Sequence, residues 1–177
     1  MGNPLNLPFD PIERAHENWA RRWGASPAMA AVTSIMRAQQ LLIGELDATL
    51  KPFGLTFARY EALVLLTFSG SGSLPLGKIG ERLMVHPTSV TNTIDRLEGQ
   101  GFVRRRPNPS DGRGVLAEIT DSGRRVTEEA TRSLLSMDFG LSCYSDEELS
   151  HIHEMFTKLR VDFGDFPARV AEVAEGR

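Results

Sequence analysis

The stretch from Leu74 to Thr120 constrains the fold most, because two helical patterns in it are followed by two strand patterns. A first helix is predicted over Pro75–Met84 and a second over Pro87–Gly101, each with one apolar stripe at helical spacing. The break between them places a proline in the first turn of the second helix. This order predicts a helix-turn-helix. The stripe residues are Leu76, Ile79 and Leu83 in the first helix, and Val90, Ile94 and Leu97 in the second.

Two strand-like runs follow, Phe102–Arg106 and Val115–Ile119. The residues between them, 107–114, contain too much proline and glycine to continue either strand or to form a helix. A β-hairpin is therefore predicted directly after the second helix. The expected fold class is mostly α with a small β-wing, in which a winged helix-turn-helix domain is joined by N- and C-terminal dimerisation helices.

The second helix carries a polar face opposite its apolar stripe. Thr88, Asn92 and Arg96 point away from the stripe, with Ser89, Thr91 and Asp95 beside them. Asparagine can contact adenine, and arginine can contact guanine, through two hydrogen bonds each. On an isolated helix such a face more often simply meets solvent, so the neighbouring features have to decide between these interpretations.

The charge distribution favours DNA. From Lys78 to Arg113 there are seven Lys and Arg against four acids, a net charge of +3 in a chain whose net charge is −3. Positive charge is therefore concentrated where a phosphate backbone would lie.

An ordered series of short motifs extends through and beyond this stretch, and about two thirds of the chain resembles the multiple antibiotic resistance regulator (MarR) family. One position departs from the family pattern: Gly112 stands where an arginine is common, which leaves Arg113 as the arginine of the wing tip. The motifs are Leu55-Thr56 to Arg59-Tyr60 and Leu63, Leu83-x-Val85, Pro87-Thr88-Ser89-Val90-Thr91, Asp95-Arg96-Leu97-Glu98, Gly101-Phe102-Val103-x-Arg105, Pro107-x-Pro109-x-Asp111-x-Arg113 and Ile119-Thr120-x-x-Gly123.

The resemblance implies a homodimeric, sequence-specific regulator of transcription that binds double-stranded DNA, and a repressor that a small-molecule effector releases. Two-fold symmetry would place the two reading helices in successive major grooves of a near-palindromic operator, with Arg113 in the adjacent minor groove. Arg105 is expected to contact phosphates, and Asp111 to orient Arg113. The predicted DNA-binding residues are His86, Pro87, Thr88, Ser89, Thr91, Asn92, Arg96, Arg105, Asp111 and Arg113.

The extra helix predicted near the N-terminus resembles that of the urate-responsive subgroup, which also carries a tryptophan there. Glu61 and Arg106 match two charged positions of that subgroup, but Thr93 replaces a further arginine, so a related anion or aromatic acid is the expected effector. Packing onto the body or across a dimer is the first role expected for the two tryptophans of this helix, and a ligand-pocket role for Trp19 is the alternative. The candidate effector-binding residues are Trp19, Tyr60, Glu61 and Arg106.

Three helices are expected to begin at polar capping residues. Thr56 caps the first, Thr120 caps the helix after the hairpin, and Ser145 forms a capping box with Glu148.

The predicted organisation is a single DNA-binding domain with helical extensions. Apolar stripes in the extensions are too many for so small a domain to cover alone, which predicts a homodimer. The expected parts are a flexible arm (1–10), N-terminal helices for dimerisation and effector binding (11–51), the winged helix-turn-helix (52–120), C-terminal dimerisation helices (121–165) and a tail (166–177).

Other functional classes have less support in the sequence. No apolar run is long enough to cross a bilayer and no secretory signal is visible, so a cytoplasmic location is expected. No catalytic motif or cofactor motif is present, which predicts a protein that is not an enzyme and needs no cofactor or metal. The alternative is a metal- or thiol-responsive regulator of the same fold, using His151 with Glu154 or the single cysteine, Cys143.

Overall fold

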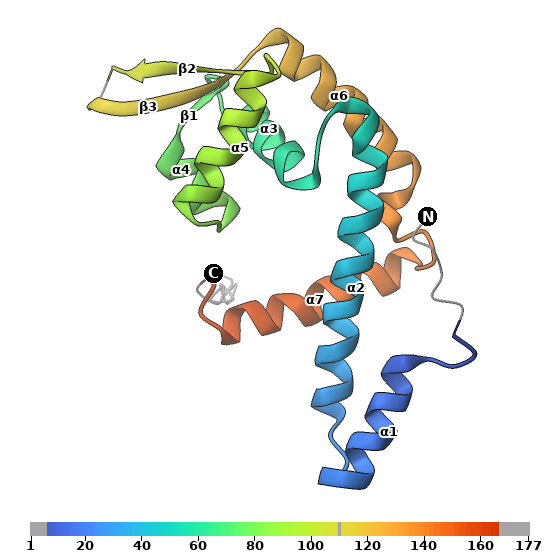
Figure 1. Ribbon diagram of the computed structural model, residues 1–177. Coiled ribbons are helices and arrows are strands. Elements are labelled where there is room, and N and C mark those ends of the chain that lie inside the picture. The colour runs from blue at the N-terminus through green and yellow to red at the C-terminus, as the bar shows by residue number, and fades with distance from the viewer. Residues whose placement is uncertain (1–6, 110, 167–177) are drawn as a thin grey trace, which may run out of the picture. The chain divides into compact units, whose positions relative to one another are not determined.

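The computed structural model describes residues 7–109 and 111–166, and only the backbone of residues 111–113. The chain forms two compact units, one that ends at Gly140 and one that begins at Leu141. The structure is mostly helical with one small antiparallel sheet, which confirms the predicted fold class (Figure 1). The elements are α1 (Pro11–Trp23), α2 (Pro27–Leu50), η1 (Lys51–Phe53), α3 (Phe57–Phe68), β1 (Ser73–Pro75), α4 (Leu76–Leu83), α5 (Pro87–Gly99), β2 (Val103–Asn108), β3 (Asp111–Ile119), α6 (Asp121–Ser136), η2 (Asp138–Gly140) and α7 (Asp146–Asp162).

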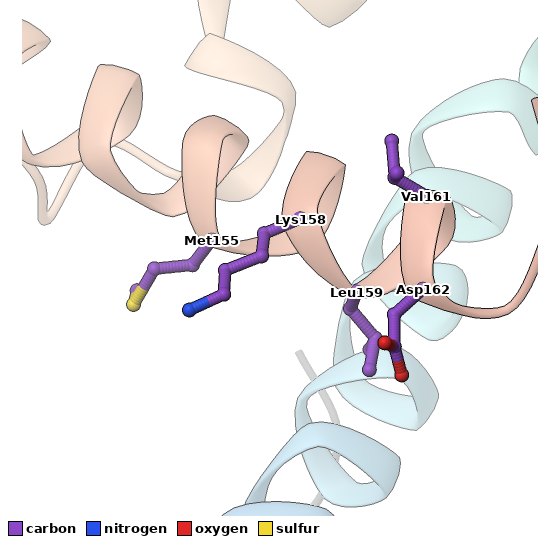
Figure 2. A pocket seen from close by; sticks show the side chains of 5 residues that line it. All are labelled: Met155, Lys158, Leu159, Val161 and Asp162. Atoms are coloured by element: carbon purple, nitrogen blue, oxygen red, sulfur yellow. The ribbon is translucent and has the colours of Figure 1, made fainter. Parts of the chain in front are cut away.

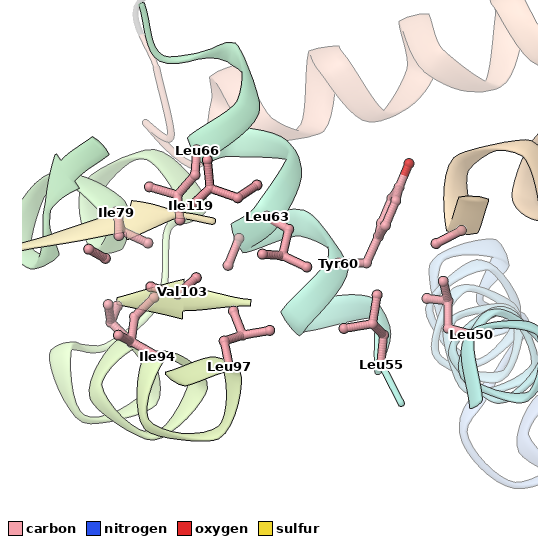
Figure 3. Packing of buried hydrophobic residues seen from close by; sticks show 14 of the residues in the cluster. Leu50, Leu55, Tyr60, Leu63, Leu66, Ile79, Ile94, Leu97, Val103 and Ile119 are labelled. Atoms are coloured by element: carbon pink, nitrogen blue, oxygen red, sulfur yellow. The ribbon is translucent and has the colours of Figure 1, made fainter. Parts of the chain in front are cut away.

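The predicted helix-turn-helix is confirmed as α4 and α5. The apolar stripe of α5 is buried: Ile94 and Leu97 are 0% exposed. Figure 3 shows these two side chains facing Val103 on β2 and Leu63 on α3, so one core holds the second helix, the hairpin and α3 together. Burial of large aliphatic side chains stabilises such a core by roughly 1.5–3 kcal/mol each.

The sheet has three strands in the order β1-β3-β2, all antiparallel. The sequence predicted the β2–β3 hairpin, hereafter the wing, but not β1, which pairs Ser73 with Glu118. A strand of three residues that ends in proline gives no alternating pattern to detect. The wing is also longer than predicted, since β2 continues through Pro107 to Asn108. Proline is tolerated there because the register shifts between these two residues, so its missing N–H breaks no regular ladder.

The N-terminus of α3 is capped in a way the sequence did not predict. Thr56 was expected to cap the helix and occupies the N-cap position, but its side chain makes no capping hydrogen bond. Instead, the Phe57 backbone N–H donates to Oδ1 of Asp47 at 2.7 Å. Asp47 lies in the last turns of α2, so this bond ties α3 directly to the long helix that precedes it.

Two other predicted caps are confirmed. The Thr120 hydroxyl accepts from the Gly123 N–H at 3.0 Å at the start of α6. Ser145 and Glu148 form the predicted capping box at the start of α7, where the Ser145 N–H donates to the Glu148 carboxylate at 2.8 Å. None of the helices in the described part of the chain combines the length and apolarity needed to span a membrane.

Helix α6 begins in close contact with the start of β2. The Thr120 N–H donates to the Phe102 carbonyl at 3.0 Å, and the Thr120 hydroxyl donates to the Gly101 carbonyl at 2.8 Å. One turn into α6, a Cβ atom added to Gly123 would lie 2.2 Å from the Phe102 carbonyl oxygen. Only glycine therefore allows α6 to approach the Phe102 backbone, just before β2, this closely.

Gly123→Ala is expected to lower the free energy of unfolding by about 1–3 kcal/mol, because the new methyl group overlaps a backbone oxygen that cannot simply rotate away. Gly77→Ala in α4 is the matched control, since nothing lies within 4 Å of a Cβ added there. The control should be neutral or stabilising by up to about 1 kcal/mol. Urea unfolding measures both variants, and equal effects would contradict the proposed close contact.

Candidate nucleic-acid interface

Helix α5 presents its polar face to solvent, as predicted. Thr88, Asn92 and Arg96, hereafter the reading face, are all exposed, while the apolar stripe on the other side of the helix is buried. Among the residues that the structure describes, no partner holds the side chains of Asn92 and Arg96 in a hydrogen bond or ion pair. These amide and guanidinium groups are therefore available to an external ligand.

The start of α5 is held by its own side chains. The predicted DNA-binding residue His86 is the N-cap, and its Nδ1 accepts from the Thr88 N–H at 3.2 Å. Pro87 follows in the first turn, and the Thr91 hydroxyl donates to the Pro87 carbonyl at 3.1 Å. His86 and Thr91 therefore each use one hydrogen-bonding group within the helix, while Ser89 is exposed beside them.

The wing separates three consecutive arginines onto two faces, because side chains alternate along a strand. Arg104 and Arg106 lie on one face and share Glu118, with N···O distances of 2.7 and 2.9 Å. Arg105 lies on the other face and forms ion pairs with Asp95 and Glu98 of α5. Its side chain is 26% exposed, against 60% for Arg104 and 59% for Arg106.

These ion pairs change the pKa values of the groups involved. Hydrogen bonds from Arg104 and Arg106 lower the pKa of Glu118 to about 2. Burial disfavours the charged form of Arg105, but hydrogen bonds to Glu98 and Asp95 outweigh it, so the pKa of Arg105 is raised. Both shifts favour the charged forms of Glu118 and Arg105, and therefore favour their ion pairs. The side chains of Asp111 and Arg113, the remaining predicted wing contacts, lie outside the described residues.

The four candidate effector residues lie in three places within the first unit, namely on α1, on α3 and on β2. Tyr60 borders a hollow of about 310 Å³ between α3 and α6, and its hydroxyl bonds to the Thr131 hydroxyl at 2.9 Å. Trp19 lies on α1 against Trp23, with ring centroids 4.7 Å apart. Arg106 is paired with Glu118 in the wing. The residues that line the hollow are Tyr60, Val64, Thr67, Phe68, Thr127, Glu128, Thr131 and Arg132.

Most of the lining of this hollow was missed by sequence reasoning. Its α6 residues, such as Thr127 and Thr131, lie more than sixty positions after Tyr60 and carry no recognisable motif. Glu61, the candidate next to Tyr60, has an exposed side chain and is not among the lining residues. Partial burial of its carboxylate nevertheless raises the pKa of Glu61.

The residues of the alternative sensing sites are also located. Cys143 is exposed and lies between η2 and α7. His151 and Glu154 lie on α7, but within residues 7–109 and 111–166 no three His, Cys, Asp or Glu side chains are grouped so as to hold a metal ion. Among these residues the fold therefore brings no third metal ligand to His151 and Glu154.

Comparison with known proteins identifies the family. The profile described as "MarR family" matches residues 56–115, from the start of α3 into the wing. The crystal structure of Sco5413, a MarR family transcriptional regulator from Streptomyces coelicolor, is 66% identical, with a TM-score of 0.75, over 80% of this chain and 99% of that one. This chain belongs to the MarR family. MarR proteins are transcriptional regulators, and this membership supports the prediction that the chain is not an enzyme.

Other MarR relatives are more distant. The organic hydroperoxide resistance transcriptional regulator of Bacillus subtilis is 31% identical over 58% of this chain and 68% of its own length. The MarR regulator Sco3205 from Streptomyces coelicolor, solved in complex with DNA, shares the fold at 24% identity and a TM-score of 0.73, over 80% of this chain and 94% of that one. The chain spans 48–80% of the length of several curated relatives that it matches.

The stabilising contribution of Glu118 is expected to disappear as the pH falls from about 4.5 to about 2. The unfolded chain binds the proton near the ordinary value of 4.5 and the folded wing only near 2, so the contribution is complete above the first value and lost towards the second. Urea unfolding at several pH values measures it. Glu118→Gln should show a shallower fall in stability across this window, and parallel curves for the two proteins would contradict the assignment.

Proposed function

We propose that this MarR protein is a sequence-specific regulator of transcription that binds double-stranded DNA through α5 and the wing. The observation that carries the proposal is the reading face, which presents hydroxyl, amide and guanidinium groups on a helix whose other side is fixed in the core. These groups match the hydrogen-bonding pattern of base edges in the major groove. The DNA complex of Sco3205 supports the proposal, because the same fold binds DNA there.

Electrostatics supports the same partner. The net charge of +3 between Lys78 and Arg113 lies in α4, α5 and the wing, within a chain whose net charge is negative. Two arginines of the wing, Arg104 and Arg106, are more than half exposed. Such a concentration of cations attracts the phosphate backbone and gives salt-dependent affinity.

A homodimer is part of the proposal. The single chain leaves large apolar side chains exposed on α2 and on α7, and exposed apolar surface of this kind marks interaction sites. Figure 2 shows Met155 and Leu159 beside a hollow of about 520 Å³ on α7. A two-fold interface would cover these helices and place two reading helices roughly 34 Å apart on a near-palindromic operator. The exposed residues are Val32, Met36, Leu41 and Ile43 on α2, and Met155, Phe156 and Leu159 on α7.

Release of a repressor by a small-molecule effector completes the proposal. The hollow beside Tyr60 supports it, since apolar side chains and hydroxyl groups line the hollow together between α3 of the DNA-binding part and α6. An effector bound there would contact both helices. It would therefore favour the conformation of the dimer to which it binds more tightly. If the two reading helices are too close or too far apart in that conformation to reach both half-sites, the affinity for the operator falls.

Asn92→Ala and Arg96→Ala should each reduce the discrimination between operator and scrambled DNA by roughly 1–3 kcal/mol, because each removes a base contact. Fluorescence anisotropy with the DNA upstream of the protein's own gene measures this difference. Arg125→Ala, which removes an exposed arginine from α6, is the matched control and should leave discrimination unchanged. An unaltered sequence preference in both α5 variants would show that α5 does not read bases.

The purified protein is expected to sediment as a dimer. Leu159→Glu should shift it towards monomers and lower operator affinity, because a carboxylate would be buried in the apolar interface. His153→Glu, which adds a carboxylate at another exposed position of α7, is the control. A wild-type protein that sediments as a single chain at micromolar concentration would exclude the dimer.

A further inference from the structure

Arg105 joins the wing to α5 through three interactions. Its Nη2 lies 2.7 Å from Asp95 Oδ1, and its Nη1 donates to Glu98 Oε2. Its backbone N–H donates to the second oxygen of the same Glu98 carboxylate at 3.0 Å. Glu98 therefore holds both the backbone and the side chain of Arg105. Asp95, Glu98 and Arg105 together are called the Arg105 clamp below.

We propose that Arg105 is a positioning residue that fixes the wing relative to the reading face, and that it does not itself contact DNA phosphates. This inference rests on the proposed DNA-binding function and revises the phosphate contact predicted for Arg105 from the sequence. It assigns a role in DNA recognition to Asp95 and Glu98, two of the four acids in the net-positive segment from Lys78 to Arg113.

The geometry argues against a phosphate contact. Both Nη atoms of Arg105 are bound to carboxylates, and its side chain is only 26% exposed. If Arg105 turned towards a phosphate, it would leave two uncompensated carboxylates on the helix that faces the DNA. Charge repulsion would then oppose the contact. Arg104 and Arg106 point to the opposite face of the wing and are more than twice as exposed.

The position of the clamp argues for a role in orientation. Asp95 and Glu98 lie on either side of the reading-face residue Arg96 along α5. Because two hydrogen bonds to a planar guanidinium define a direction as well as a distance, the clamp fixes the rotation of α5 relative to β2. DNA binding requires α5 and the wing to reach adjacent grooves at once, so a fixed angle between them favours binding.

The first test asks whether removing an acid of the clamp strengthens or weakens DNA binding. Removing an acid from a DNA-binding segment normally strengthens binding, because it raises the net charge. If the clamp positions the wing, Glu98→Ala should instead weaken binding to the upstream DNA, on the order of tenfold. Glu81→Ala in α4 is the matched control: Glu81 is also an exposed helical acid paired with a basic residue, Lys78. The control should bind as tightly as the wild type or more tightly.

A second test keeps the charge and changes only the geometry. Lysine carries the same charge as arginine, but its ammonium group cannot bridge two carboxylates as a planar fork does. Arg105→Lys should therefore weaken DNA binding as much as Arg105→Ala does. Arg125→Lys, at an exposed position of α6 outside the proposed DNA-binding surface, is the control and should bind like the wild type. Both Arg105 variants should also keep the wild-type slope of log affinity against log salt, since no phosphate contact is lost.

The outcomes separate the inference from the function on which it rests. If the wild type binds neither the upstream DNA nor random duplex at low ionic strength, the proposed function fails and the inference fails with it. If the wild type binds but Glu98→Ala binds more tightly, or Arg105→Lys binds normally while Arg105→Ala flattens the salt slope, Arg105 is a phosphate contact and the inference alone is overturned. Melting temperatures confirm that each variant is folded, and Asp95→Asn repeats the sign test if Glu98→Ala is unstable.

Discussion

The structure of the DNA-binding part depends on the burial of one side of α5. Ile94 and Leu97 are fully buried against α3 and β2, so the helix cannot rotate about its axis without exposing them. This constraint decides which residues of α5 face outward. Packing of the apolar stripe fixes the orientation of α5 in the core. The side chains of the reading face therefore need no contacts within the protein, and they remain free for a ligand.

A second constraint acts on the wing, where the period of a strand distributes like charges over two faces. Because the three adjacent residues are arginines, each face of the wing carries positive charge, and the acids near each face decide how much of that charge is compensated. On one face Arg104 and Arg106 share a single carboxylate, so part of their positive charge remains uncompensated. On the other face two carboxylates of α5 hold Arg105. The same residue type therefore provides charge for a ligand on one face and internal structure on the other.

Local sequence signals predicted well wherever the partners of an interaction lie within a few residues of each other. The stripes of α4 and α5 and the caps formed by Thr120 and Ser145 belong to this class, because helical periodicity and capping are local. The prediction that the Thr56 side chain caps α3 was wrong, because the acceptor is Asp47, which belongs to the preceding helix. Strand β1 was missed because so short a strand exists only through its pairing with β3. The hollow beside Tyr60 escaped prediction for the same reason, since α6 contributes half of its lining.

The sequence by itself determined the order of the helices around the β2–β3 hairpin, the family resemblance, and which side of α5 faces outward, because each depends on spacing along a single stretch of chain. Only the tertiary structure decided what the charged residues do. Arg104, Arg105 and Arg106 are consecutive residues of one type, and their ion pairs differ because an acid from β3 lies beside two of them and two acids from α5 lie beside the third. The role of a charge depends on its neighbours in space, and those neighbours are set by long-range packing.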